Sequence, residues 1–158
     1  MQTIPMLYLE DIQEDRPMPS RNHSIIAQNL SYFLQSRYRE QYRVYPQLSL
    51  QLDGWATIPD ISVFRVGVLT ADWHNDEEEV LLPPDLVIEV LSPKQNLQPL
   101  VGKILRYMEK GVRSCWLVMP MTHTIILYQP GQQEQSFSTG VMHDPQLGMD
   151  LPLDEVFA

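Results

Sequence analysis

A carboxylate set inside an apolar segment is the feature of this sequence that points most directly to chemistry. Glu89 lies within residues 86–91, whose other members are Leu, Val and Ile, between a Pro-Pro pair and a Ser-Pro pair. This composition predicts a strand that is buried on both faces and ends at the prolines. A buried carboxylate needs a partner, which can be a proton, a cation or a metal. The identity of that partner would indicate the function.

Two other acidic residues could join Glu89. Alternation along the strand places Asp85 on the same face, but four residues away, or about 13 Å, which is too far to share one metal. Asp60 lies at the entry of another short predicted strand, at residues 59–65. If this strand and residues 85–91 pair as an antiparallel hairpin with Phe64 opposite Asp85, which is an assumed register, Asp60 falls opposite Glu89. Opposed like charges destabilise a sheet unless a positive charge lies between them. Such a carboxylate pair, with main-chain carbonyls nearby, predicts an Mg²⁺ site, and a register slip of one residue would separate the pair.

A lysine on the next predicted element could act at the same point. Residues 96–110 predict a helix that ends at Gly111, with Lys103 at the border of its apolar stripe and Arg106 and Lys110 further into solvent. A lysine near two carboxylates can orient a water or stabilise charge on a phosphorus centre. The alternative is that Lys103 extends to the rim and Glu89 pairs with an arginine, which spacing alone favours slightly. The stripe is predicted to contain Leu97, Leu100, Val101, Ile104, Leu105 and Met108.

The remaining elements predict the architecture that must position these residues. Ser20 or Asn22 can cap a first helix over residues 23–38, which has no acidic residue in its body, and His23 in its first turn is interpreted as solvent-facing or locally bonded. The alternation in residues 43–52, with Pro46 at an edge or bulge, predicts a strand before the Asp-Gly turn at 53–54. The stripe of the first helix contains Ile26, Leu30, Phe33 and Leu34.

The order of predicted elements is helix, three strands, helix and two strands, which is an α/β fold with a mixed sheet. The strands between residues 43 and 91 should be antiparallel neighbours, because no helix separates them. The second helix should cross over to a parallel strand at residues 114–119, followed by a strand at 124–128. Short extended pieces from Phe137 onward end in a turn that can dock, and residues 6–9 can form an edge strand.

Composition limits the classes of function. The 158 residues fit one domain, with residues 1–19 as an extension and 20–157 as the core. The single cysteine, Cys115, lies in an apolar run, which predicts a buried thiol and fits the reducing cytoplasm. No leader and no membrane-spanning run are evident. The net charge of −9 argues against a broad basic surface for nucleic acid, although a metal-loaded site remains compatible with it, and the acidic run at 76–79 reads as a solvated, mobile face.

Several of these segments resemble the Uma2 family, small and chiefly bacterial and cyanobacterial proteins grouped with the PD-(D/E)XK endonucleases. The resemblance covers roughly residues 20–157 and implies a restriction-endonuclease-like core. It implies that Asp60 and Glu89 bind Mg²⁺ or Mn²⁺ and that Lys103 positions the nucleophile, with Asp85 as an outer or structural carboxylate and Tyr107 as a packing residue whose hydroxyl lies at the rim. The segments that carry the resemblance are Pro59-Asp60, residues 84–93, Lys103, Tyr107 and residues 111–118.

The resemblance also contains departures from the superfamily pattern. The superfamily lysine stands two residues after the acid, where this chain has Leu91, so Lys103 on the following helix takes its place, with Lys94 as a weaker substitute. A glutamate in the first helix is missing. The expected function is metal-dependent hydrolysis of phosphodiester bonds in nucleic acid, with DNA preferred, in a cytoplasmic protein whose acidic surface and small groove favour a homodimer. The alternatives are a degenerate nuclease fold that serves as a binding module, favoured by the acidic charge and by Leu91, and a hydrolase of small phosphate compounds.

Overall fold

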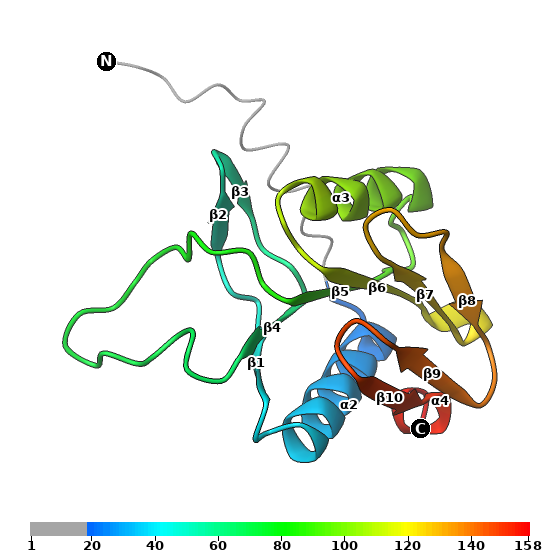
Figure 1. Cartoon of the computed structure of the whole chain (residues 1–158). Coiled ribbons are helices and arrows are strands. Elements are labelled where there is room, and N and C mark those ends of the chain that lie inside the picture. The colour runs from blue at the N-terminus through cyan, green and yellow to red at the C-terminus, as the bar shows by residue number, and fades with distance from the viewer. Residues whose placement is uncertain (1–18) are drawn as a thin grey trace.

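Six strands form one mixed sheet in residues 19–158, the part of the chain that the computed structural model describes (Figure 1). They are β1 (Tyr42–Pro46), β4 (Ile61–Arg65), β5 (Leu86–Val90), β6 (Ser114–Met119), β7 (Thr124–Tyr128) and β8 (Gln135–Phe137). Their order across the sheet is β1-β4-β5-β6-β7-β8; β5 and β6 are parallel, and the other neighbours are antiparallel. The predicted α/β fold with a mixed sheet is confirmed.

One face of the sheet is covered by α2 (Arg21–Arg37), together with β9 (Val141–Asp144), β10 (Met149–Pro152) and α4 (Leu153–Val156). Figure 1 shows this layer on one side of the sheet and α3 on the other. The helix begins where the Ser20 side chain accepts a hydrogen bond from the His23 backbone N–H, as the predicted cap requires. Ile26, Leu30 and Leu34 are its buried apolar residues, so most of the predicted stripe is confirmed.

The opposite face is covered by α3 (Leu97–Glu109), which ends just before Gly111, a residue with a φ of +100°. The buried residues of α3 are Leu100, Lys103, Ile104 and Tyr107. The predicted stripe was therefore wrong in part, because Leu97 and Leu105 are exposed at 43% and 47%. Lys103 and Tyr107 take the inward positions instead, since the sheet beneath them carries a carboxylate that both side chains contact.

The predicted strand at residues 43–52 is two strands in the structure. β1 ends at Pro46, which has no N–H for a ladder, and the next residue, Gln47, has a φ of +48°. The chain then forms a separate hairpin of β2 (Leu50–Leu52) and β3 (Trp55–Thr57) around the predicted Asp-Gly turn. The sequence did not predict β3, which carries Thr57 toward α3.

β5 is buried along its whole length, as predicted, and alternate residues face opposite layers. Leu86, Ile88 and Val90 belong to the apolar cluster under α2, whereas Val87 belongs to the cluster under α3. Cys115 is also buried, as predicted, and burial raises the pKa of its thiol. The edge strand predicted at residues 6–9 lies outside the described residues. Within the described part of the chain, every helix is too short or too polar to cross a membrane.

Candidate active site

The pairing of β4 with β5 has the register that places Asp60 opposite Glu89. The paired residues are Ile61 with Ile88, Ser62 with Val87, and Val63 with Leu86. The next pair in this register is Asp60 with Glu89. The Asp60 carboxylate also accepts a hydrogen bond, at 2.7 Å to Oδ2, from the backbone N–H of Val90, the residue after Glu89. The two carboxylates thus stand at neighbouring positions at one end of the sheet.

Glu89 is contacted by two side chains from α3. Lys103 Nζ lies 3.5 Å from Glu89 Oε1, and the Tyr107 hydroxyl donates to the same oxygen at 3.1 Å. The Lys103 side chain is only 8% exposed, so it points inward and does not extend to the rim of the helix. The interpretation that spacing alone favoured, with Lys103 at the rim and an arginine beside Glu89, was therefore wrong.

The environment of Glu89 favours the neutral form of its carboxyl group when no metal ion is bound. Burial raises the pKa of Glu89 to about 8, and the nearby Asp60 charge acts in the same direction. Lys103 opposes these effects, as does the hydrogen bond from Tyr107. Glu89 is consequently a carboxyl group that a proton or an added cation can stabilise.

The Tyr107 hydroxyl links Glu89 to the β2–β3 hairpin. Its oxygen lies 2.7 Å from Thr57 Oγ1, and its ring packs 4.8 Å from the ring of Trp55, measured between centroids. Burial and the Glu89 charge raise the pKa of Tyr107 well above its usual value, so this hydroxyl keeps its proton as a donor. Sequence reasoning missed Thr57 because it missed β3; only the turn signal before that strand indicated a hairpin.

His23 is a second residue whose role the sequence analysis missed. It was interpreted as solvent-facing or locally bonded, but it is 7% exposed, and its Nε2 lies 3.1 Å from Asp60 Oδ2. The hydrogen bond to Asp60 raises the pKa of His23, against the effect of burial. A signal was present in the sequence, because His23, Ile26 and Leu30 follow helical spacing along one face of α2.

The oxygen atoms around the carboxylate pair are of the chemical type that hard divalent cations bind. Within the described residues, the hydrogen bonds to Asp60 go to Oδ2 and the contacts of Glu89 are at Oε1, so Oδ1 and Oε2 are left for a ligand. Ser62 is buried on the face shared with Val87 and Glu89, and its hydroxyl has no hydrogen-bond partner among residues 19–158. Mg²⁺ and Mn²⁺ prefer such oxygen ligands.

The donor set is small. Residues 19–158 contain no group of three or more His, Cys, Asp or Glu residues arranged to hold a metal. A cation held here would take the two carboxylates as ligands, with water in other positions, as in many protein sites for Mg²⁺.

Asp85 lies away from this pair, at the other end of β5. Its Oδ2 accepts from the Arg65 backbone N–H at 3.0 Å, and its Oδ1 lies 3.4 Å from Arg113 Nη1 and 3.7 Å from Arg65 Nε. These contacts join the ends of three strands.

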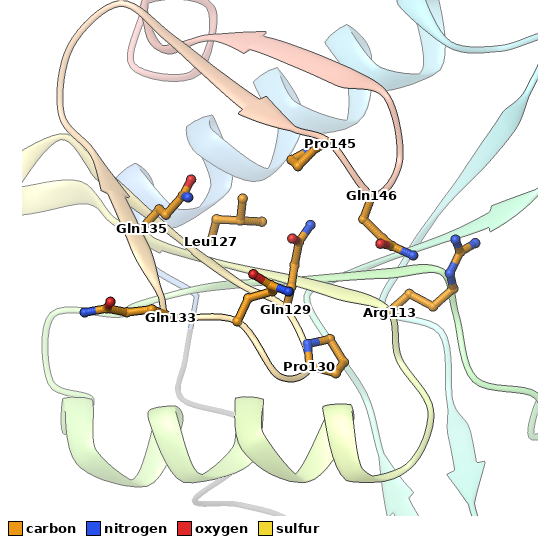
Figure 2. Close-up of a pocket in the computed structure, with 9 residues that line it drawn as sticks. Arg113, Leu127, Gln129, Pro130, Gln133, Gln135, Pro145 and Gln146 are labelled. Atoms are coloured by element: carbon orange, nitrogen blue, oxygen red, sulfur yellow. The ribbon is translucent and has the colours of Figure 1, made fainter.

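A pocket of about 450 Å³ lies elsewhere on the molecule, where the β7–β8 and β9–β10 turns face each other (Figure 2). Arg113, which lines the pocket, lies four residues before Leu117, and Leu117 is the β6 partner of Glu89. The pocket therefore opens at the end of the sheet opposite to Glu89. Figure 2 shows polar amide side chains around it. The pocket is lined by Arg113, Leu127, Gln129, Pro130, Gln132, Gln133, Gln135, Pro145 and Gln146.

Comparison with known proteins identifies a family and a fold. The profile of the Uma2 family, described as putative restriction endonuclease, matches residues 8–154. A crystal structure of a putative nuclease belonging to DUF820, from Anabaena variabilis, superposes with a TM-score of 0.79 at 26% identity, over 89% of this chain and 83% of that chain. No curated protein matches.

A second structural match is more distant. It is a structure of the DrdV–DNA complex, with a TM-score of 0.44 and 16% identity, covering 83% of this chain and 11% of that chain.

Proposed function

The chain belongs to the Uma2 family, and from this premise we propose that it is a metal-dependent endonuclease that hydrolyses phosphodiester bonds in nucleic acid, with DNA as the preferred substrate. Asp60 and Glu89 would hold Mg²⁺ or Mn²⁺, and Lys103 would act on the attacking water. The observation that carries the proposal is the register that sets Asp60 opposite Glu89, with Lys103 Nζ 3.5 Å from Glu89.

The side chains have distinct parts in this mechanism. The Lys103 ammonium has three N–H donors, of which one faces Glu89, so the others can orient a water or bind a phosphate oxygen. Tyr107 donates to Glu89 Oε1 and fixes that carboxylate, because Thr57 holds the tyrosine hydroxyl from its other side. Asp60 is fixed by the backbone N–H of Val90.

A bound divalent cation would supply a Lewis acid that lowers the pKa of water and offsets the charge of the scissile phosphate. The candidate ligand atoms, Oδ1 of Asp60 and Oε2 of Glu89, lie at the end of the sheet. Glu89 is buried, whereas the Asp60 side chain is 22% exposed, so water and substrate would complete the coordination from the Asp60 side.

Metal-dependent cleavage by the purified protein tests the proposal. Supercoiled plasmid and a labelled single-stranded oligonucleotide are incubated with Mg²⁺, with Mn²⁺ or with EDTA. The variants are Asp60→Asn, Glu89→Gln and the matched control Asp53→Asn, which alters an exposed Asp–Lys pair at the hairpin tip. We expect the wild type and the Asp53 variant to cleave with metal only, and the Asp60 and Glu89 variants to lose cleavage.

Each other outcome has a definite meaning. Cleavage that survives both carboxylate substitutions would indicate a contaminating nuclease and overturn the proposal. Hydrolysis of a small phosphodiester without cleavage of nucleic acid would identify a small-molecule phosphohydrolase. Calorimetry without Mn²⁺ binding, together with no hydrolysis, would identify a binding module built on a nuclease fold.

A further inference from the structure

His23 joins α2 to Asp60, one member of the carboxylate pair. Its backbone N–H donates to the Ser20 hydroxyl at 3.2 Å, which fixes the residue in the first turn of α2. Its ring Nε2 lies 3.1 Å from Asp60 Oδ2, and the ring is 7% exposed. One residue therefore links the start of α2 to the residue just before β4.

Asp60 depends on such contacts for its orientation. It lies in a bend before β4, outside the strand itself, and its side chain is 22% exposed. The backbone N–H of Val90 donates to Oδ2, the same oxygen that His23 contacts. Two donors from different layers of the fold thus hold one oxygen, and rotation of the carboxylate is restricted. Oδ1 is then left in a fixed direction.

We propose that His23 is a positioning residue of the metal site: its Nε2–H, together with the Val90 N–H, holds Asp60 Oδ2 so that Oδ1 is presented to a divalent cation. This inference rests on the proposed function, because it assumes that Asp60 is a ligand. Partners that orient a ligating carboxylate commonly change metal affinity by about 10–100-fold when they are removed.

This role also accounts for what α2 contributes to the site. Residues 21–37 contain no Asp or Glu, so the helix offers no carboxylate ligand. It offers a donor to a ligand instead. Because His23 shares one stripe with Ile26 and Leu30, the packing of α2 on the sheet sets the distance between its ring and Asp60.

The matched pair His23→Gln and His23→Asn tests the contact. The glutamine amide nitrogen can occupy nearly the position of Nε2, whereas the shorter asparagine cannot reach it. Mn²⁺ affinity is measured by calorimetry on the full chain after removal of metal, with Asp60→Asn as a ligand control. His143→Asn is the control for the loss of a histidine. The His143 side chain is exposed and pairs with Asp150, and neither residue belongs to the candidate site.

We expect His23→Asn to weaken Mn²⁺ binding by about 10–100-fold, and His23→Gln and His143→Asn to stay within about threefold of wild type, about 0.7 kcal/mol. Equal affinities for His23→Asn and wild type, or equal losses in the two His23 variants, would overturn the positioning role. If His23→Asn does not fold, His23→Ala replaces it under the same criteria.

The two proposals fail in different ways. A wild type that binds no Mn²⁺ refutes the metal site and the role of His23 with it. A wild type that binds Mn²⁺, with loss in Asp60→Asn and none in His23→Asn, refutes the role of His23 alone.

Discussion

Lys103 Nζ lies 3.5 Å from Glu89 Oε1, and both side chains are less than a tenth exposed. Lys103, in the middle of α3, and Glu89, next to the last residue of β5, thus meet between the helix and the sheet face that it covers. Removal of one member would leave the other buried without its partner, which is costly for a charged group. The pair is therefore the part of the candidate site where substitutions should have the clearest effects.

The pKa of Glu89 predicts how the stability of the metal-free protein depends on pH. Burial raises this pKa from 4.5 to about 8, so between these values the folded state holds a proton that the unfolded state has lost. The free energy of unfolding should then fall as pH rises through this window, by at most about 1.4 kcal/mol per pH unit. Glu89→Gln removes this contribution.

Urea unfolding in EDTA at pH 5, 6, 7 and 8 measures the effect. We expect the stability of Glu89→Gln relative to wild type to increase steadily toward pH 8. Parallel pH profiles of the two proteins would show that Glu89 does not titrate in this range.

Lys103→Met should remove most catalytic activity while the fold persists. General acid–base and orienting groups contribute about 10²–10⁴-fold to rate, so we expect a loss of that size in single-turnover cleavage. Lys110→Met is the matched control, because Lys110 caps the C-terminal end of the same helix and pairs with Asp53 at the surface. Similar rates in the two variants would exclude a role for Lys103.

Tyr107 and Thr57 should be energetically coupled. In Tyr107→Phe, the Thr57 hydroxyl and Glu89 Oε1 each lose the tyrosine hydroxyl as a hydrogen-bond partner. We expect the free energy of unfolding to fall by about 1–3 kcal/mol. The double variant with Thr57→Val should cost less than the sum of the single variants, by about 1 kcal/mol. Additive costs in denaturant unfolding would show that the 2.7 Å contact does not stabilise the fold.

Asp144 should stabilise the fold without serving the candidate site. This buried carboxylate accepts hydrogen bonds from Trp116 Nε1, Gln129 Nε2 and the Leu147 backbone, and also from the Ser114 hydroxyl. Asp144→Asn replaces one acceptor oxygen by a donor, and we expect a loss of about 2–3 kcal/mol in the free energy of unfolding.

Asp150→Asn is the control, because its exposed side chain pairs only with His143 in the same hairpin among the described side chains. It should change stability by no more than about 0.5 kcal/mol. An Asp144 variant as stable as this control would contradict the expected role of the buried network.

Strand periodicity, a local property, limited the possible registers of the carboxylate pair, and the structure selects the assumed one among them. Ile61 and Val63 must face the same layer as Leu86 and Ile88 if all four are to be buried under α2, and only alternate registers satisfy that requirement. Once that face is set, Glu89 faces the α3 layer, and Asp60 takes the register position opposite it, in the bend just before β4. The buried β5 strand and the turn at residues 53–54 followed from equally local signals.

The rotation of the helices could not be decided in this way. An apolar stripe on a helix can be turned by one position with little change in the apolar area that it buries. On α3 a stripe through Leu97 and Leu105 and the observed stripe through Lys103 and Tyr107 were both compatible with the sequence. The same holds for His23 on α2, whose burial depends on where Asp60 lies.

The sequence by itself therefore determined the α/β fold, the buried strand, and the acidic residues that could pair across two strands. Only the tertiary structure decided that Lys103, Tyr107 and His23 point toward those acids and that Thr57 joins them. The reason is physical: strand alternation is specified residue by residue, whereas the rotation of a helix is set by the polar partners it meets across the layer, and those partners come from distant parts of the chain.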